Sequence, residues 1–305
     1  MNSDPSDSLP ITEQENARSA NLSSLPMPEI VNLMNAEDAQ VAAAVAEVLP
    51  QVVKAVAGVV ERLKEGGRLF YIGTGTSGRL GVLDAAECPP TFGVSPELVQ
   101  AIIAGGYEAC YRAVEASEDD PESAKRDLLE RGFRKNDALI GIAASGRTPY
   151  TVGAVEYARS LGAFTAAITC VPDSPITKAA EVSIVPIVGP EVLTGSTRLK
   201  AGTAQKMVLN MISTATLVQL GFVSGNRMSN IRASNSKLRQ RAIRVIRAET
   251  DLSEAGASMA LDAAGGDTKL ALVMARTGSD ENLARGALSE SKGVVQEAIK
   301  RISGK

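Results

Sequence analysis

The sequence predicts an α/β fold: a doubly wound, five-stranded parallel sheet with helices on both faces, followed by a small all-helical domain. Five short apolar runs lie between residues 61 and 224, and helical patterns separate them. Strands that are apolar along their whole length are typical of parallel sheets covered on both faces. After residue 224 only helical periodicity continues. The five predicted strands are RLFYIG, LVQAIIAG, ALIGIAAS, FTAAITC and VSIVPIV.

The chain divides into three predicted parts. Residues 1–60 comprise a polar, flexible tail and leading helices, whose apolar repeat at every third and fourth residue is interrupted at Pro50. Residues 61–224 contain the sheet and end with a long helical pattern. Residues 225–305 form the small helical domain. Its first helix has a basic run that we expect to be a solvated face rather than an anion-binding surface, formed by Arg239, Arg241, Arg244 and Arg247.

The composition limits the possible partners. A net charge of −3 gives no reason to expect nucleic acid or an anionic membrane. The polar N-terminus does not resemble a secretory signal, and no uncharged apolar run is long enough to span a bilayer. The three cysteines, Cys88, Cys110 and Cys170, lie far apart in apolar surroundings, which argues against a disulfide framework. We therefore expect a cytoplasmic protein that binds neither nucleic acid nor a membrane.

The sequence contains no histidine. This excludes histidine-based acid–base catalysis, Ser-His-Asp triads and most zinc-site patterns. An enzyme with this composition must transfer protons with other side chains near neutral pH. Carboxylates are the leading candidates.

The first predicted strand runs into a glycine-rich loop, Gly73-x-Gly75-x-x-Gly78, which has the spacing of a dinucleotide-binding turn. Such a turn requires an acidic residue at the end of the second strand, where it holds the ribose hydroxyls. Here the second strand ends AIIAGG, and the nearest acid, Glu108, lies beyond it. The loop is therefore not predicted to bind a dinucleotide.

The same loop carries hydroxyl groups at the expected start of a helix, from Thr74, Thr76 and Ser77. Hydroxyls beside the N–H groups of a helix N-terminus suit one compact phosphate. The alternative is a glycine-rich turn in which a serine caps the helix, which is common in α/β folds. The loop alone does not decide between the two.

A second loop favours the phosphate site. The third predicted strand ends IAASGRTPYTVGAV, with Ser145 and Thr148 before a helix whose first turn can hold Pro149. The first and third strands of open parallel sheets are commonly neighbours, so the two loops can converge on one anion. Arg79 and Arg147 follow the loops and could add positive charge. The predicted phosphate contacts are Ser77, Ser145 and Thr148, with Thr76 as an addition and with Gly78 and Gly146 allowing close backbone approach.

These paired loops resemble those of the sugar isomerase (SIS) fold, whose Ser/Thr turns hold the phosphate of a phosphosugar. The segment GPEVLTGSTRLKAGTAQK, residues 189–206, is similar to the signature shared by N-acetylmuramic acid 6-phosphate etherases and the glucokinase regulatory protein. Three further segments resemble the etherases closely: GTSGRLGVLDAAECPPTFGVSPELVQAIIAGG, GIAASGRTPYTVGAVEYA and KMVLNMISTATLVQLGFVSGNRM. The resemblance extends from about Asn35 to the C-terminus and is weakest in the final helices. It implies an SIS-type sheet domain, a small phosphosugar substrate, and neither a cofactor nor a metal ion.

The reaction that this resemblance implies removes D-lactate from N-acetylmuramic acid 6-phosphate and leaves N-acetylglucosamine 6-phosphate, in the recycling of cell-wall amino sugars. It proceeds by β-elimination: the acidic C2 proton of the open sugar is removed, the C3 ether oxygen leaves as lactate, and water adds at C3. Two carboxylates match the family's catalytic positions, Glu87 in DAAECPP as the acid that protonates the lactate and Glu118 in AVEASEDD as the second acid/base. A raised pKa is expected for Glu87 because its neighbours are weakly polar. On the residues alone, Glu87 also fits a surface position near a helix end, and Glu118 fits a solvated acidic loop in which Glu115 is a rival.

The signature segment contains further candidate residues. The resemblance implies sugar contacts for Ser196 and Thr197, which are predicted to open the long helix and which also fit simple N-capping. Three more polar residues of the segment have no assigned role at this point: Glu191, Arg198 and Lys200.

The separation between the phosphate loop and Glu87 favours a homodimer. A straight helix from Gly78 to Glu87 would rise roughly 13 Å at ~1.5 Å per residue, too far for the carboxylate to reach a hexose phosphate held at the start of the same helix. Either the helix is short or bent, or Glu87 serves the phosphosugar of a second subunit. The resemblance to SIS proteins implies a dimer with shared sites, so we favour a homodimer with shared active sites.

Two other functions fit the same fold. An aldose–ketose phosphosugar isomerase would interconvert sugars without releasing lactate. A non-catalytic phosphosugar sensor similar to the glucokinase regulatory protein would bind ligand without turnover and would not need Glu87. The single apparent SIS unit argues against that two-unit regulator.

Overall fold

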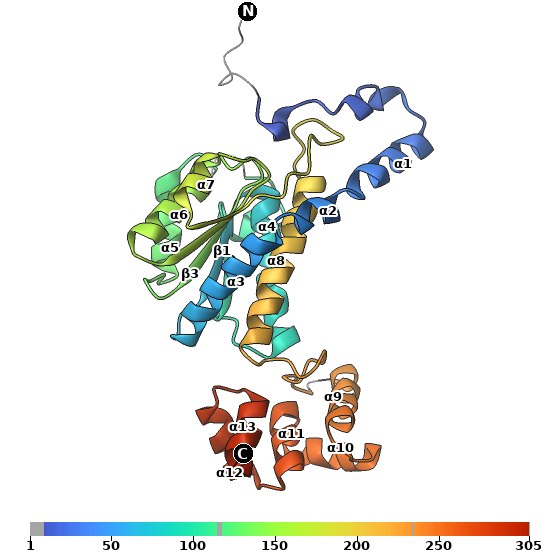
Figure 1. The fold of residues 1–305 in the computed structure, drawn as a ribbon, viewed down its shortest axis with the longest axis vertical. Coiled ribbons are helices and arrows are strands. Elements are labelled where there is room, and N and C mark those ends of the chain that lie inside the picture. The colour runs from blue at the N-terminus through green and yellow to red at the C-terminus, as the bar shows by residue number, and fades with distance from the viewer. Residues whose placement is uncertain (1–8, 115–117, 234, 305) are drawn as a thin grey trace, which may run out of the picture. The chain divides into compact units, whose positions relative to one another are not determined.

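The computed structural model describes residues 9–114, 118–233 and 235–304 (Figure 1). The chain forms two compact units. The first comprises Met1–Ala86 and Glu97–Ser213, and the second comprises Glu87–Pro96 and Thr214–Lys305. Each unit has its own apolar core, so the two are described separately below.

The first unit is built around a parallel five-stranded sheet with the order β2-β1-β3-β4-β5. Every predicted strand is present, and the predicted fold class is confirmed. β1 lies between β2 and β3 and pairs with both, so the first and third strands are neighbours as expected. The strands are β1 (Leu69–Gly73), β2 (Val99–Ile103), β3 (Ala138–Ile142), β4 (Phe164–Ile168) and β5 (Val182–Ile184).

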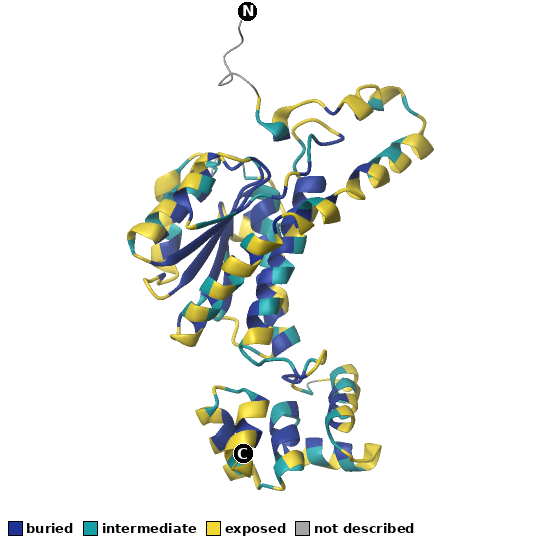
Figure 2. Ribbon diagram, viewed as in Figure 1, coloured by how far each residue is buried: buried dark blue, intermediate teal, exposed yellow. Residues whose placement is uncertain are grey.

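Helices cover both faces of the sheet, and the three central strands, β1, β3 and β4, are buried along their whole length (Figure 2). α3 (Leu49–Lys64) packs on β3, β4 and β5, and α6 (Pro149–Ser160) packs on β1, β3 and β4 from the other face. The packing on α3 is close: a side chain at Gly58 would place its Cβ 2.3 Å from the Phe164 ring. The sandwich explains why the strands are apolar on both sides. The other flanking helices are α4 (Gly75–Phe92), α5 (Pro121–Glu130), α7 (Pro175–Ala179) and α8 (Lys200–Gln219).

Short turns and two helices precede α3. The predicted interruption at Pro50 is confirmed, because α3 begins at Leu49 and holds the proline in its first turn, where a missing N–H costs little. Among the described residues, no single helix is long and apolar enough to cross a membrane; only the pair Met27–Ala46 and Leu49–Lys64, bent by 59° at its break, reaches that length and composition together. The leading elements are η2 (Ile11–Glu13), η3 (Ala17–Ser19), η4 (Leu22–Ser24), α1 (Met27–Asp38) and α2 (Val41–Ala46).

The second unit is a bundle of short helices around an alanine- and leucine-rich core. Side-chain oxygens of Asn235, Ser253, Asp267 and Asp280 cap four of these helices at their N-termini. The basic run on α9 is partly paired within the unit, since Arg239 contacts Asp262 at 2.6 Å and Arg247 contacts Glu254 at 3.0 Å. The helices are α9 (Ser236–Glu249), α10 (Glu254–Ala263), α11 (Thr268–Thr277), α12 (Glu281–Glu290) and α13 (Val295–Ser303).

Candidate functional site

The two predicted phosphate loops leave the sheet at paired positions. β1 ends at Gly73 and β3 ends at Ile142, and these two residues are opposite each other in the register. Gly73 can only be glycine here, because an added Cβ would lie 2.7 Å from the Ile142 carbonyl oxygen. A Cβ at Gly78 would lie equally close to the Gly73 carbonyl oxygen. The absence of side chains at Gly73 and Gly78 therefore allows α4 to pack tightly against the strand ends, and the two loops come close together.

The first loop places hydroxyl groups in the first turn of α4. Ser77 is 8% exposed, and its Oγ donates a hydrogen bond to Gln205 Oε1 of α8 at 3.0 Å. Thr76 is half-buried and faces the same helix, with its methyl carbon 3.5 Å from the position of a Cβ on Gly202. The predicted contacts Thr76, Ser77 and Gly78 thus all lie at the N-terminus of α4, where backbone N–H groups favour an anion.

The second loop is equally constrained. The Oγ of Ser145 accepts a hydrogen bond from the backbone N–H of Arg147 at 3.3 Å, which folds the loop on itself. Gly146 has φ +67°, and an added Cβ would lie 2.2 Å from Ser174 Oγ, so glycine is required. Thr148 is the N-cap residue of α6, and Pro149 is in its first turn as predicted. The loop therefore ends at a second helix N-terminus beside the first.

Glu118 lies between the two loops. Its carboxylate Oε1 is 3.6 Å from the position of a Cβ on Gly75, at the start of α4. Its backbone oxygen accepts a hydrogen bond from the Tyr150 N–H in the first turn of α6 at 3.1 Å. The structure thus brings a carboxylate to the loops that carry the predicted phosphate contacts. The rival, Glu115, lies outside the described residues.

Glu87 lies much further along α4 and is exposed. α4 is one helix from Gly75 to Phe92, so it is not short, and its two internal prolines, Pro89 and Pro90, come after the glutamate. The catalytic role of Glu87 stays a prediction.

The signature segment caps α8 in a way that the sequence did not indicate. α8 begins at Lys200, not at Ser196, and Ser196 and Thr197 form the turn before it. The carboxylate of Glu191 accepts hydrogen bonds from the backbone N–H groups of Lys200 at 3.0 Å and Ala201 at 2.9 Å. Burial raises the pKa of the Glu191 carboxyl, against the opposing effect of these N–H donors. The capping group is therefore a buried acid nine residues upstream of the helix.

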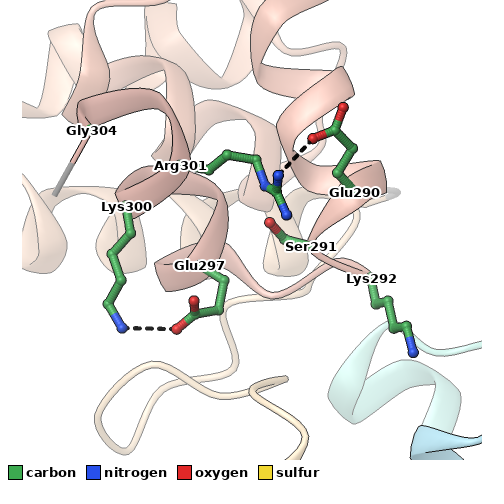
Figure 3. A pocket seen from close by; sticks show the side chains of 7 residues that line it. All are labelled: Glu290, Ser291, Lys292, Glu297, Lys300, Arg301 and Gly304. Carbon is green, nitrogen blue, oxygen red and sulfur yellow. Dashed lines mark hydrogen bonds and ion pairs between the residues drawn. The ribbon is translucent and has the colours of Figure 1, made fainter.

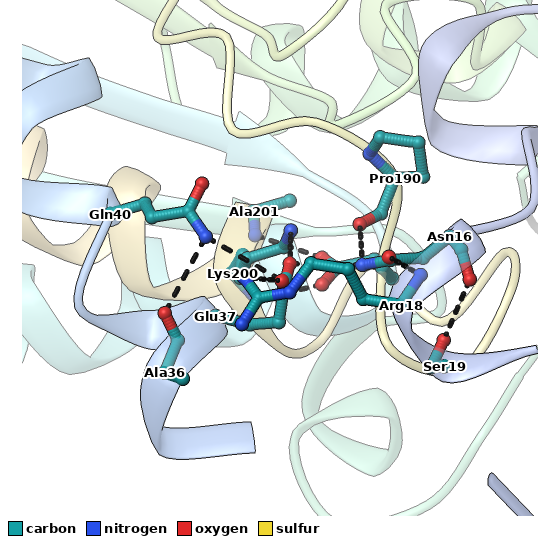
Figure 4. Close-up of polar contacts among 10 residues, drawn as sticks. Asn16, Arg18, Ser19, Ala36, Glu37, Gln40, Pro190, Lys200 and Ala201 are labelled. Atoms are coloured by element: carbon teal, nitrogen blue, oxygen red, sulfur yellow. Dashed lines mark hydrogen bonds and ion pairs between the residues drawn. The ribbon is translucent and has the colours of Figure 1, made fainter. Parts of the chain in front are cut away.

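An ion cluster around the buried pair of Glu37 and Lys200 joins this segment to the N-terminal part of the chain (Figure 4). Lys200 Nζ lies 2.5 Å from Glu37 Oε2, and both side chains are at most 3% exposed. Asn16 donates to the same carboxylate at 2.9 Å and to the Pro190 carbonyl at 3.2 Å, while Arg18 contacts its other oxygen at 2.6 Å. We call Asn16, Arg18, Glu37 and Lys200 the Glu37 cluster. It fastens α1 and the turn at residues 16–19 to the start of α8 and to the signature segment.

The Glu37 cluster makes the stability of the first unit depend on pH. Burial alone would raise the pKa of the Glu37 carboxyl, but Lys200, Asn16 and Arg18 outweigh it and hold the pKa below its ordinary value of 4.5. The stabilisation is therefore complete above pH 4.5 and is lost as the pH falls through the lower folded value. We expect the difference in free energy of unfolding between the unmodified chain and Glu37→Gln to shrink below about pH 4.5. Urea unfolding at several pH values measures it, and a constant difference would contradict the assignment.

A second polar contact joins α4 to α8 between the phosphate loop and Glu87. The carboxylate Oδ1 of Asp84 accepts hydrogen bonds from Asn210 Nδ2 at 2.6 Å and from Ser213 Oγ at 3.1 Å. With the bond between Ser77 and Gln205, it fixes the register of the two helices. Sequence reasoning missed both contacts, because an acid or an amide within a helix gives no local signal of its tertiary partner.

A hollow in the second unit lacks the hydroxyl-bearing loops of this site. This hollow of about 590 Å³ is lined by charged residues of α12 and α13 (Figure 3). Lys300 pairs with Glu297 at 2.8 Å and Arg301 pairs with Glu290 at 3.0 Å, so these charges largely neutralise one another. Within the described part of the chain, no group of three or more Cys, Asp or Glu side chains is placed to hold a metal ion.

Comparisons with known proteins identify the family. The model of the glucokinase regulatory protein N-terminal SIS domain matches residues 51–159, and the SIS domain model matches residues 123–248. The N-acetylmuramic acid 6-phosphate etherase of Klebsiella aerogenes is 48% identical over 95% of this chain and 96% of that protein. The etherase of Clostridium beijerinckii is 50% identical over 96% of this chain and 97% of that protein. The chain belongs to the N-acetylmuramic acid 6-phosphate etherase family.

This membership confirms the family predicted from the loops and the signature segment. A solved structure supports the fold alone: a candidate phosphosugar isomerase involved in capsule formation from Bacteroides fragilis superposes with a TM-score of 0.51 at 24% identity. The match covers 65% of this chain and 93% of the isomerase.

Proposed function

We propose that the chain is a carbon–oxygen lyase that cleaves the D-lactyl ether of N-acetylmuramic acid 6-phosphate to give N-acetylglucosamine 6-phosphate and D-lactate. The observation that carries the proposal is the position of the Glu118 carboxylate beside two hydroxyl-bearing loops at paired strand ends. The 50% identity to an etherase along nearly the whole chain supports the same substrate. We place this activity in the cytoplasm, in the recycling of cell-wall amino sugars.

The loops would hold the substrate by its phosphate. The N-termini of α4 and α6 supply N–H groups and a favourable dipole, and hydroxyls supply further donors. Gly78 and Gly146 keep the backbone accessible to the phosphate oxygens. The sugar itself would contact the turn before α8 at Ser196 and Thr197. The hydroxyl donors are Thr76, Ser77, Ser145 and Thr148.

The two glutamates would divide the proton transfers. Glu118 removes the C2 proton of the open-chain sugar, whose acidity comes from the neighbouring aldehyde. The electron pair forms the C2–C3 double bond while the C3–O bond breaks, and Glu87 gives its proton to the departing lactate oxygen. In the second stage Glu87, now a carboxylate, takes a proton from the water that adds at C3, and Glu118 returns its proton to C2. At the end of the cycle both glutamates have their starting protonation states.

The length of α4 supports a shared site. Because α4 continues past Glu87, the Cα atom of Glu87 lies roughly 13 Å beyond that of Gly78 along the helix axis at ~1.5 Å per residue. A hexose phosphate held at one end of a helix does not reach a side chain so far along it. We therefore propose a homodimer in which Glu87 serves the phosphosugar bound by the partner subunit.

Hydrolysis in oxygen-18 water tests the reaction. Incubation with N-acetylmuramic acid 6-phosphate should release unlabelled D-lactate and place the heavy oxygen at C3 of the sugar product, as mass spectrometry would detect. Label in the lactate would show that the bond on the lactyl side had broken instead. Absence of lactate would overturn the proposal, and sugar interconversion without lactate would indicate an isomerase.

A further inference from the structure

Gln205 of α8 is completely buried beside the phosphate loop. Its Oε1 accepts the hydrogen bond from Ser77 Oγ at 3.0 Å, and its Nε2 is buried without a hydrogen-bond partner among the described residues. A buried donor without a partner is costly, so an orphaned amide beside a ligand site needs an explanation. Gly202, one turn before Gln205, lies against Thr76, which keeps this part of α8 next to the loop.

The present pairing is unsuited to phosphate binding. A serine hydroxyl has one proton to donate, and here Ser77 gives it to Gln205. A phosphate at the N-terminus of α4 accepts hydrogen bonds, so it needs that same proton. If the amide turns by 180° about its last carbon–carbon bond, Nε2 takes the place of Oε1 and donates to Ser77 Oγ. The serine proton is then released toward the ligand, the amide N–H gains Ser77 Oγ as its partner, and Oε1 takes the position that Nε2 leaves.

We propose that Gln205 is a positioning residue for substrate phosphate: its amide turns to donate to Ser77 Oγ and directs the Ser77 hydroxyl at the bound phosphate. The inference rests on the proposed function, because it takes Ser77 as a phosphate contact. Gln205 itself does not touch the ligand. The Asp84 contacts with Asn210 and Ser213 hold α4 and α8 in register, so the amide can change its orientation without a shift of the helices.

Substitution of Gln205 by methionine tests the inference, because methionine keeps the length of the side chain without a strong donor. We expect the dissociation constant of inorganic phosphate, measured by calorimetry, and the KM for the phosphosugar to rise roughly ten-fold, while kcat stays within about two-fold. In the Ser77→Ala background the same substitution should have little further effect, since the hydroxyl that it positions is gone. Unchanged phosphate affinity in a folded Gln205→Met variant would overturn the inference.

A second variant separates positioning from packing. In Gln205→Glu the introduced carboxylate can only accept, so it should retain the Ser77 proton and weaken phosphate binding at pH 8. Burial favours the protonated carboxyl, which can donate, and so the ratio of the variant's KM to the unmodified KM should fall toward pH 6. A ratio independent of pH would contradict the inference even if Gln205→Met failed to fold. The proposed function has its own test, because it fails if the unmodified chain releases no lactate. In that case the calorimetric measurement of phosphate binding still decides the role of Gln205.

Discussion

Replacing Lys200 by methionine should lower the free energy of unfolding of the first unit by about 3–5 kcal/mol. The substitution leaves the buried Glu37 carboxylate without the ammonium group that lies 2.5 Å from it. Arg18 cannot compensate, because its side chain is half exposed and its attraction is screened by water. Urea unfolding followed by circular dichroism measures the loss, and hydrogen exchange at the start of α8 should show the same local destabilisation.

Lys206→Met is the matched control. Lys206 lies on the same helix and is exposed, so the same change should alter the free energy of unfolding by no more than about 0.5 kcal/mol. A double variant, Glu37→Met with Lys200→Met, should be less destabilised than the sum of the two single changes, because each single change leaves a lone buried charge and the double change removes both charges. Equal losses for Lys200→Met and Lys206→Met would show that the Glu37 cluster does not stabilise the fold.

The sheet could be predicted because its physical cause is local in the sequence. A strand covered by helices on both faces must be apolar at every position, so Leu69–Gly73 and Ala138–Ile142 appear as continuous apolar runs. The loops that follow were predictable for a similar reason. Gly73 is required by a backbone contact across the pair of β1 and β3, Gly146 is required by its positive φ, and the hydroxyls beside them mark a helix start.

The contacts that support the site could not be predicted from local patterns. Glu37 and Lys200 are 163 residues apart, and Ser77 and Gln205 are 128 residues apart. Hydrophobic periodicity and residue propensity predict the secondary structure of a segment and which of its faces is buried. They carry no information about which distant side chain contacts that segment. The start of α8 shows the same limit: a capping residue is expected directly before a helix, whereas Glu191 reaches its N–H groups across a loop. Each of these contacts depends on tertiary arrangement alone.

Replacing Glu87 by glutamine should lower kcat for lactate release by roughly 10²- to 10⁴-fold, with a much smaller change in KM. The amide keeps the size of the side chain and cannot give a proton to the departing ether oxygen, whose expulsion as an alkoxide is slow. Lactate release under saturating substrate measures the loss. Glu156→Gln, an exposed glutamate on α6, is the matched control and should leave kcat unchanged. Equal rates for the two variants would remove Glu87 from the mechanism.

A substrate with fluorine in place of the lactyl ether at C3 distinguishes the two glutamates. Fluoride leaves without needing a full proton, so the Glu87→Gln variant should eliminate it at nearly the unmodified rate. The Glu118→Gln variant should lose both reactions, because the C2 proton must still be removed.

Mixing two inactive variants tests for a shared site. If Glu87 acts on the partner's substrate, a mixture of Glu87→Gln and Ser77→Ala chains forms some dimers with one complete site, and lactate release should return. If both groups act within one chain, no mixed dimer has an intact site, and the mixture should stay as slow as its components.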